Sequence, residues 1–401
     1  MKYIILLGDG MADKNIAELG EKTPLQYANT PHMDYLAANG EIGMAGTVPE
    51  GFQPGSDVAN LSVLGYNPRE YYTGRSPLEA VSMGIELDDE DVAYRCNLVT
   101  LSEKGKYEEK TMVDYSADEI TTAESGQLIT EVSDRLGSGK LKFYAGFGFR
   151  HLLVWNGGPA SVKLTPPHDI SGRVITPYLP AGKGSEVLFN LMKESSTFLP
   201  AHPVNGKRSE TGARPANSIW FWGQGKRPAL PKFQDKYGLS GSVISAVDLI
   251  KGIGICAGLD VVKLEGVTGT VHTNYRGKVR AALEELHNGK DFVYIHVEAP
   301  DAAGHRGELD TKIHAIEMVD EMLGMLLKEL DCFERYKVML LPDHPTPLHT
   351  MTHSSNPVPF AVFTKGQQKN CSRTFDEKSA AATGLYLAGH TLMDYFVDHK
   401  I

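Results

Sequence analysis

Short apolar runs that end in glycine or polar residues constrain the fold of this chain more than any other feature. Runs of this length are typical of strands that are buried on both faces, as in the sheets of α/β proteins. Stretches with helical periodicity alternate with them, so we expect a sheet with helices packed on its faces. The predicted strands are Tyr3–Leu7, Ile219–Trp222, Val261–Leu264, Phe292–Val297, Val338–Leu341 and Phe360–Phe363.

Helical periodicity is clearest in Ser242–Ala257 and in Lys312–Leu330, where apolar residues recur at the spacing of one helix face. A further helix is expected to follow Ser56, with Ala59, Leu61 and Leu64 as its apolar positions. Together with the strands, these helices predict the α/β fold class.

The middle of the chain has a different pattern, with shorter segments and several Pro and Gly breaks. Its predicted strands, such as Tyr94–Leu101 and Leu152–Trp155, contain Thr or lie between such breaks. We interpret this stretch as an α+β domain inserted into the first domain, with hinges near residues 84–90 and 212–218. The predicted domains are therefore a discontinuous one, 1–86 with 216–401, and an inserted one, 87–215.

Composition excludes several classes of protein. With 401 residues the chain is long enough for two domains, and its formal net charge of -10 disfavours nucleic acid as a partner. No apolar run approaches the roughly 20 residues that span a membrane, and the N-terminal run is too short for the core of a signal peptide. The scattered cysteines predict reduced thiols in a cytoplasmic protein; they are Cys96, Cys256, Cys332 and Cys371.

The first strand ends in a carboxylate between two glycines, in the sequence "KYIILLGDGM". The spacing is not a dinucleotide fingerprint, because Asp13 stands where the third glycine should be. Glycines at a strand end allow a tight turn and a close approach by another group. Asp9 is therefore either an ordinary turn residue or a functional group that the turn presents.

Two further strand ends carry Asp and His side chains, in "EAPDAAGHRG" and "PDHPTPLHTMTHSSNPVPF". A helical turn would place the first Asp–His pair on one face, where both could bind one ion. Ligands gather at the carboxyl ends of strands in open α/β sheets, and this donor set suits Mn²⁺ or Zn²⁺. A single histidine of this kind is more often structural; the set comprises Asp301, His305, Asp343, His344, His349 and His353, with Asp9 on a third strand end.

Ser56 follows a Pro-Gly turn and precedes a helical run in "PGSDVANLSVLGY". This is the position of an N-capping serine, which is its ordinary interpretation. The amides at a helix N-terminus also favour an anion such as phosphate. A serine there, beside a metal site, is a candidate nucleophile for displacement at phosphorus.

These motifs resemble the cofactor-independent phosphoglycerate mutases of the alkaline phosphatase superfamily. The resemblance rests on "GDGM", "GSDVANLS", "PDAAGH", "PDH" and "HSSNPVP", taken in this order along nearly the whole chain. The length and the stretch "AVDLIKGIGICAGLDVV" are similar to the shorter, archaeal-type branch of that family.

The resemblance implies an alkaline-phosphatase-like three-layer core that carries two divalent metal ions, and an inserted phosphotransferase domain. Mn²⁺ is the expected metal, with Zn²⁺ or Mg²⁺ as alternatives. Ser56 would be transiently phosphorylated. One ion would be held by Asp9, Ser56, Asp343 and His344, and the other by Asp301, His305 and His353; His349 is the alternative to His353.

The implied substrate is a small phosphorylated three-carbon acid, whose negative charges guanidinium groups would meet. Lys263, in "DVVKLEG", matches a family lysine near the phosphoserine. A solvated surface charge is the ordinary role for any single arginine. The substrate-binding candidates are Arg95, Asn97, Arg150, His151, Arg208 and Arg214.

The expected function is the interconversion of 2- and 3-phosphoglycerate, as in glycolysis, by an isomerase with a phosphoserine intermediate. The stretch "LPDHPTPLH" also resembles a subgroup proposed to be homoserine kinases, although the chain has no phosphate-binding nucleotide loop. A metal-dependent phosphatase is the next alternative, and a metal-binding scaffold without catalysis is the last. No base for the accepting hydroxyl and no oligomeric state follow from the sequence.

Overall fold

The computed structural model describes residues 1–103, 105–367 and 369–398, and the chain divides into two compact units. Unit 1 consists of Met1–Tyr72 and Ala229–Ile401, and unit 2 of Thr73–Pro228. These boundaries lie outside the predicted ones because α5 (Ser76–Ser82) packs on the sheet of unit 2 and β7 (Ser218–Gly225) is a strand of that sheet. The predicted strand Ile219–Trp222 therefore belongs to the inserted unit and not to the main sheet.

The main sheet of unit 1 runs in the order β13-β2-β12-β11-β1-β10-β8-β9. The central strands β11, β1, β10 and β8 are parallel, whereas β12 is antiparallel to both of its neighbours. The strands are β1 (Lys2–Gly8), β2 (Glu41–Gly46), β8 (Gly241–Ile244), β9 (Asp260–Val261), β10 (Phe292–Val297), β11 (Tyr336–Leu341), β12 (Val358–Thr364) and β13 (Tyr386–Ala388).

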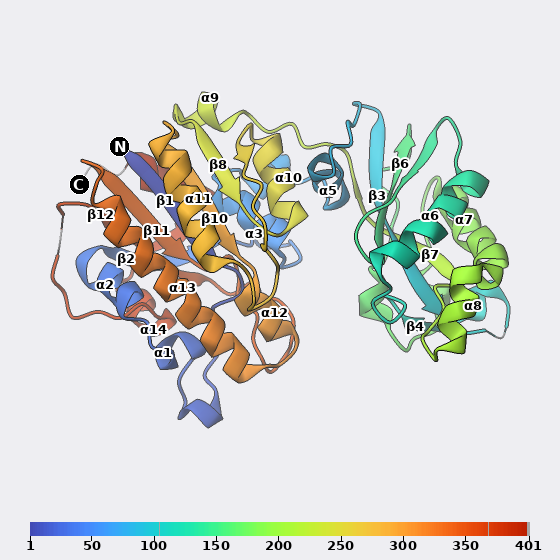
Figure 1. The fold of residues 1–401 in the computed structure, drawn as a ribbon, viewed down its shortest axis with the longest axis horizontal. Coiled ribbons are helices and arrows are strands. Elements are labelled where there is room, and N and C mark those ends of the chain that lie inside the picture. Colours follow the sequence, from blue (N-terminus) through green and yellow to red (C-terminus); the bar gives the residue numbers. More distant parts are fainter. Residues whose placement is uncertain (104, 368, 399–401) are drawn as a thin grey trace. The chain divides into compact units, whose positions relative to one another are not determined.

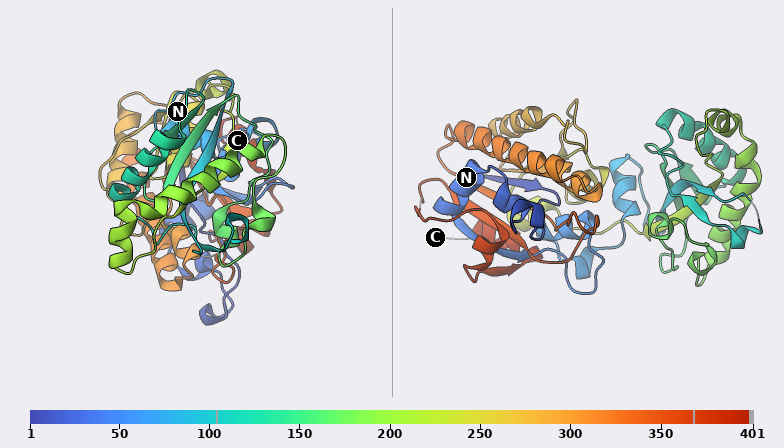
Figure 2. Two further views of the ribbon diagram at one scale, coloured as in Figure 1. Left: turned by 90° about the vertical axis from the view of Figure 1, so that its right-hand side faces the viewer. Right: turned by 90° about the horizontal axis from the view of Figure 1, so that it is seen from below.

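Helices cover both faces of this sheet, with α11 and α13 on one face and α3 and α10 on the other (Figures 1 and 2). Side chains of β1 alternate between the faces: Ile4 and Leu6 join the core under α13, and Tyr3 meets Phe396 of α15. The helices are α1 (Pro24–Tyr27), α2 (Pro31–Asn39), α3 (Ser56–Val63), α4 (Pro68–Tyr71), α9 (Phe233–Tyr237), α10 (Asp248–Cys256), α11 (Tyr275–His287), α12 (Ala299–His305), α13 (Leu309–Leu330), α14 (Glu377–Ala381) and α15 (Leu392–Asp398).

This arrangement confirms the predicted three-layer α/β core, but two predicted elements are wrong in detail. The helix predicted over Ser242–Ala257 begins only at Asp248, because Gly241–Ile244 is the strand β8, paired with β10. Strand β9 ends at Val261 and does not extend to Leu264. Short apolar runs fit either periodicity, so the pattern alone could not separate the strand from the helix.

Unit 2 is an antiparallel sheet with helices α6, α7 and α8 packed against one face (Figure 1). Strand β3 lies at its centre and pairs with β4, β6 and β7, while β5 pairs with β6. This is the α+β architecture that the sequence predicts for the inserted segment. Its elements besides α5 and β7 are β3 (Asp91–Leu101), β4 (Met112–Asp114), α6 (Thr122–Leu136), β5 (Leu141–Tyr144), β6 (Arg150–Asn156), α7 (Ser185–Phe198) and α8 (Pro203–Glu210).

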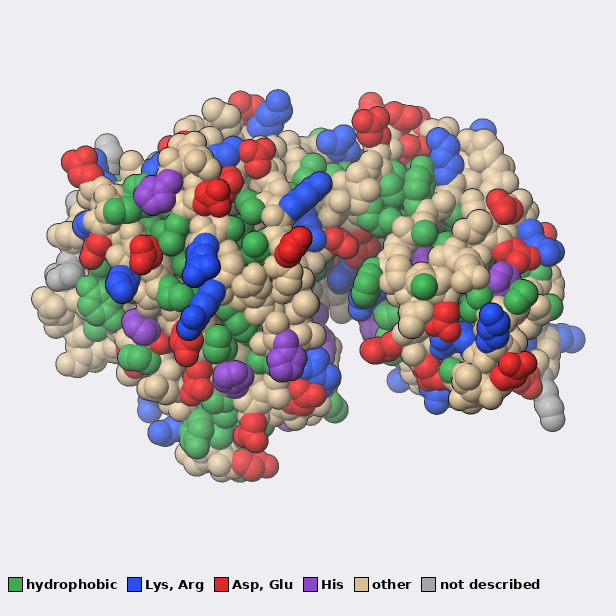
Figure 3. Space-filling view, viewed as in Figure 1, with side chains coloured by type: hydrophobic (Ala, Val, Ile, Leu, Met, Phe, Trp, Pro, Cys, Tyr) green, Lys and Arg blue, Asp and Glu red, His purple; other side chains and the backbone are tan. Residues whose placement is uncertain are grey.

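The surface and the thiols agree with the composition. Within the described residues, no helix is both long and apolar enough to cross a membrane. Acidic and basic side chains are interspersed over the face of unit 1 that Figure 3 shows. The thiols of Cys96, Cys256, Cys332 and Cys371 are free, as the scattered cysteines predict.

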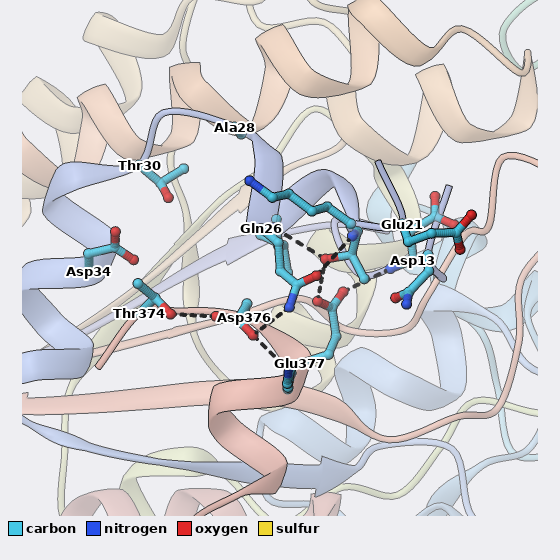
Figure 4. Close-up of a pocket in the computed structure, with 14 residues that line it drawn as sticks. Asp13, Glu21, Gln26, Ala28, Thr30, Asp34, Thr374, Asp376 and Glu377 are labelled. Carbon is cyan, nitrogen blue, oxygen red and sulfur yellow. Dashed lines mark hydrogen bonds between the residues drawn. The ribbon is translucent and has the colours of Figure 1, made fainter. Parts of the chain in front are cut away.

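A buried ion pair fixes the loop that follows β1. The Nζ of Lys312, on α13, lies 2.7 Å from Asp13 Oδ2, and both side chains are excluded from solvent. Lys312 also donates to the carbonyl oxygen of Thr346, at 2.8 Å. On its other side the loop borders a pocket of about 650 Å³, where Glu377 accepts hydrogen bonds from the Asp13 N–H and the Thr23 hydroxyl (Figure 4).

Replacing Lys312 should therefore destabilise unit 1 selectively. Lys312→Met leaves the Asp13 carboxylate buried without its partner, which should lower the free energy of unfolding by about 3–5 kcal/mol. The added substitution Asp13→Asn should recover part of this loss. Lys328→Met, at an exposed position of the same helix, is the matched control.

Urea unfolding would be followed by far-UV circular dichroism and by tryptophan fluorescence. All three tryptophans, Trp155, Trp220 and Trp222, lie in unit 2, so fluorescence reports on the unit that should not change. Equal stability of the Lys312 and Lys328 variants would contradict a structural role for the pair.

Candidate active site

The candidate metal ligands meet at one edge of the unit 1 sheet. Strands β11, β1 and β10 are parallel neighbours, so their carboxyl ends lie side by side. Asp9 follows β1, and Asp343 and His344 follow β11. The helix after β10, α12, carries Asp301 and His305 four residues apart on one face, as the spacing predicts.

Ser56 lies at this edge as the first residue of α3. Gly55 is the N-cap, and the Ser56 side chain makes no capping hydrogen bond, so the interpretation as an N-capping serine is wrong. The Ser56 Oγ instead lies 3.3 Å from Asp9 Oδ2 and 3.2 Å from His344 Nε2. The hydroxyl proton can be donated to only one of these partners; if it goes to Asp9, the Ser56 oxygen accepts from His344 when Nε2 is protonated and faces a free electron pair when it is not.

Asp9 is fully buried, and only one of its two carboxylate oxygens has hydrogen-bond partners among the described residues. Its Oδ2 lies within hydrogen-bond distance of Ser56 and of His296 Nε2, at 2.9 Å, whereas its Oδ1 has no hydrogen-bond partner among the described residues. Burial, and then the neighbouring Asp343 and Asp301, raise the pKa of the Asp9 carboxyl well above its usual range. A divalent cation would offset the free-energy cost of burying the Asp9 charge and would contact the Oδ1 atom.

Asp301 lies between two histidines. Its carboxylate oxygens are 3.3 Å from His305 Nε2 and 3.3 Å from His353 Nε2, and the two ring nitrogens are 2.8 Å apart. Burial alone would raise the pKa of Asp301, but its hydrogen bonds to the histidines hold it well below the usual value. Burial also opposes protonation of His305, yet the bond to Asp301 raises the pKa of His305 to about 9. A metal ion at this site would therefore have to displace a proton.

His344 connects the two groups of ligands. Its Nε2 lies 3.7 Å from Asp9 Oδ1 and 3.4 Å from Asp343 Oδ2, and its ring packs 4.0 Å from the ring of His353. Burial lowers the pKa of His344, which favours the neutral imidazole that binds metals. Asn60, one turn after Ser56, donates a hydrogen bond to Asp343 Oδ2 at 2.9 Å.

The residues present fit divalent cations. Donor atoms of Asp301, His344 and His353 lie within 4.8 Å of one another, as do those of Asp9, His296 and Asp343 and those of Asp9, Glu298 and Asp301. Mixed carboxylate and imidazole donors suit metals such as Mn²⁺ and Zn²⁺. His349 is exposed and belongs to none of these groups, so His353 is the better candidate of the two.

Sequence reasoning missed the residues that orient these ligands. His296 lies within β10, is fully buried and contacts Asp9; burial lowers the pKa of His296 to about 3, which keeps it neutral. The signal was a histidine inside a continuous apolar strand, "FVYIHV". Asn60 and Thr346 gave no comparable signal, because one lies within a helix and the other within a loop.

Four of the predicted substrate-binding residues lie on or beside β3 and β6 of unit 2. The Arg95 guanidinium pairs with Glu79 at 2.9 Å and stacks over the Trp222 ring, and Asn97 accepts a hydrogen bond from Trp222 Nε1. Arg150 is exposed and lies opposite Asn97 in the strand register. His151 is buried beneath this face, opposite Cys96.

The remaining predicted residues have other surroundings. Arg208 is buried and donates to Glu124 and to the carbonyl oxygens of Ala117 and Arg214, which favours a structural role. Arg214 is exposed and pairs with acidic residues of unit 2. Lys263 is exposed in the loop after β9.

Comparisons with known proteins agree with the fold. A sequence model of 2,3-bisphosphoglycerate-independent phosphoglycerate mutases matches residues 37–205. A probable enzyme of that name from Geobacter sulfurreducens is 53% identical over 99% of this chain and 100% of its own length. The Methanosarcina barkeri enzyme of that name is 49% identical over 96% of each chain.

Two solved structures share the whole architecture. A protein from Pyrococcus horikoshii is 30% identical, with a TM-score of 0.82 over 99% of this chain and 96% of that chain. A cofactor-independent phosphoglycerate mutase from Thermoplasma acidophilum is 26% identical, with a TM-score of 0.66 over 100% of both chains.

The buried His151 should make unit 2 sensitive to acid. Burial, followed by the charge of Arg95, lowers the pKa of His151 to about 3, against about 6.5 in an unfolded chain. Between these values the unfolded state binds the extra proton, so stability is complete above pH 6.5 and falls as the pH drops toward 3. The expected slope from this group is about 1.4 kcal/mol per pH unit.

His151→Asn keeps an acceptor for the Gly146 N–H. It should reduce the number of protons taken up on unfolding by about one, so the free energy of unfolding should depend less steeply on pH. Urea unfolding followed by tryptophan fluorescence between pH 4 and 7 measures it, since the fluorescence reports on unit 2. Parallel curves for the wild type and the variant would show that His151 is not the titrating group.

Proposed function

The chain belongs to the 2,3-bisphosphoglycerate-independent phosphoglycerate mutase family, and we propose that it interconverts 2- and 3-phosphoglycerate through a phosphoserine at Ser56. Enzymes of this kind are isomerases, in which a phosphoryl group leaves one hydroxyl of a molecule and returns to another. The observation that carries the proposal is the Ser56 hydroxyl, buried between Asp9 and His344 at the carboxyl edge of the parallel strands.

The position of Ser56 suits an attack on phosphorus. As the first residue of α3, it lies where backbone N–H groups of the helix are unpaired and where the helix dipole favours an anion. The ends of β1 and β11 fix Asp9 and His344, the two side chains that contact the Ser56 oxygen, and so hold that oxygen in place.

The transfer balances in two half-reactions. The Ser56 oxygen forms a bond to phosphorus, the bond from phosphorus to the substrate oxygen breaks, and the Ser56 proton passes by way of the site to the leaving oxygen. In the second half the other hydroxyl of glycerate attacks the phosphoserine, and its proton ends on Ser56. The result is a moved phosphoryl group with no net change in atoms or protons.

Two divalent cations complete the proposed site, with Mn²⁺ as the first choice and Zn²⁺ or Mg²⁺ as alternatives. Bound there, they would supply Lewis-acid stabilisation of the transferring phosphoryl group and lower the pKa of the Ser56 hydroxyl. Asp9, Ser56, Asp343 and His344 would hold one ion, and Asp301, His305 and His353 the other.

The glycerate carboxylate requires cationic partners, and the proposal assigns these to unit 2. Arg150 is the strongest candidate because its guanidinium is exposed, and Arg95 and Asn97 lie on the neighbouring strand. Lys263 is the unit 1 candidate for a contact with the phosphoryl group. The proposed substrate is thus a small phosphorylated acid. The proposed enzyme acts in glycolysis, in the cytoplasm.

Ser56→Ala should abolish turnover while leaving the metal ligands in place. We expect kcat for conversion of 3-phosphoglycerate to 2-phosphoglycerate to fall at least about 10⁴-fold, because the nucleophile is lost. Ser62→Ala, a buried serine on the same helix, should retain activity. Retained activity in the Ser56 variant would remove this residue as the nucleophile.

A paired assay of the purified, Mn²⁺-loaded wild type distinguishes the mutase from the alternative activities. One reaction contains 3-phosphoglycerate, and the other contains homoserine and ATP. Formation of 2-phosphoglycerate without added bisphosphoglycerate supports the mutase proposal. Phosphohomoserine in the second reaction, with no product in the first, would replace it with a kinase that uses the same site. Release of inorganic phosphate alone would indicate a phosphatase.

A further inference from the structure

Thr346 occupies a buried position between the two groups of proposed metal ligands. It follows His344 by two residues and packs against glycines of two other elements, Gly10 and Gly304. A Cβ atom at Gly304 would lie 2.8 Å from the Thr346 Cγ2, and one at Gly10 would lie 2.6 Å from its Oγ1. The close approach of these backbones, together with its β-branched side chain, fixes the direction of the Thr346 hydroxyl.

This hydroxyl contacts a ligand from each group. The Thr346 Oγ1 lies 2.5 Å from Asp301 Oδ1 and 3.3 Å from His344 Nδ1. Asp301 belongs to the group with His305 and His353, whereas His344 belongs to the group with Asp9 and Asp343. No other described side chain hydrogen-bonds to both of these residues in the contacts above.

The contact between Thr346 and His344 selects one of the two imidazole tautomers. A carboxylate only accepts, so the Thr346 hydroxyl donates its proton to Asp301. Its oxygen can then only accept, so a hydrogen bond with His344 places the imidazole proton on Nδ1, whereas the other tautomer would donate from Nε2 to the Ser56 oxygen. The Nε2 of His344 is left with a free electron pair directed at the Ser56 side of the site, which is the state a metal ligand requires.

The backbone of Thr346 is held as firmly as its side chain. Lys312 donates to its carbonyl oxygen at 2.8 Å, and its N–H donates to the carbonyl oxygen of Ala12 at 3.2 Å. The same Lys312 is paired with Asp13, so the loops after β1 and β11 are fixed against each other. The hydroxyl therefore cannot relax away from Asp301 without breaking buried contacts.

We propose that Thr346 is a positioning residue that couples the two proposed metal sites, orienting Asp301 for one ion and setting the tautomer of His344 for the other. The inference rests on the two-metal site of the proposed function and adds a residue to it. Removing one hydroxyl should then weaken binding at both sites, although Thr346 is a ligand of neither.

The test compares Mn²⁺ binding by chelator-stripped wild type and variants, measured by isothermal titration calorimetry and by electron paramagnetic resonance of free Mn²⁺. Thr346→Val keeps the shape of the side chain and removes the hydroxyl. It should weaken the binding of each of the two Mn²⁺ ions by about 10- to 100-fold. Thr346→Ser restores the hydroxyl and should bind within about threefold of the wild type. Thr364→Val, at a buried threonine near the far end of β12, should bind as the wild type does.

The outcomes separate this inference from the proposed function. A wild type that binds no Mn²⁺ would overturn the two-metal site and the inference with it. A wild type that binds two ions, with equal affinities in Thr346→Val, would overturn only the role of Thr346. Thermal unfolding of each stripped variant shows whether it is folded before titration.

A measurement on the wild type covers the case in which Thr346→Val does not fold. Nitrogen-15 labelling of histidines distinguishes the two ring tautomers by chemical shift in the chelator-stripped protein, with the His344 signals assigned from His344→Asn. The inference predicts a proton on Nδ1 of His344. A proton on Nε2 would overturn it.

Discussion

The structure depends on the burial of several carboxylates at one edge of a parallel sheet. Asp9, Asp301 and Asp343 are excluded from solvent, and donor atoms of the first two lie within 4.8 Å of each other and of Glu298. Burial, and then repulsion by the charges of Asp343 and Asp301, raise the pKa of the Asp9 carboxyl well above its usual range. Such a site is stable when protons or cations offset the repulsion, so the fold favours the binding of positive charge at this edge.

The surrounding fold explains how the carboxylates are held despite that repulsion. The central strands are buried on both faces and set the positions of their carboxyl ends. Neutral donors each hold one oxygen of these carboxylates: His296 on Asp9, Asn60 on Asp343 and Thr346 on Asp301. Oriented partners of this kind fix a ligand's geometry before the ion arrives.

The sequence predicted which candidate ligands the structure brings together, because they follow strands and strand ends can be recognised from apolar runs. Asp9, Asp301 and Asp343 each stand directly after such a run or within one turn of it. The orienting residues could not be predicted in the same way, since Thr346 and Asn60 act across the chain through tertiary contacts. The boundaries of the inserted unit were misplaced for a similar reason: β7 joins that unit by pairing with β3, which no local pattern reveals.

Crystals of the Mn²⁺-loaded protein, with anomalous diffraction recorded at the manganese edge, test the central claim most directly. The account predicts two anomalous peaks at the carboxyl edge of β1, β10 and β11. One peak should lie beside Asp9, Ser56 and His344, and the other beside Asp301, His305 and His353. A single peak, or peaks bound by residues outside this set, would contradict the two-metal site from which the proposed phosphoryl transfer by Ser56 follows.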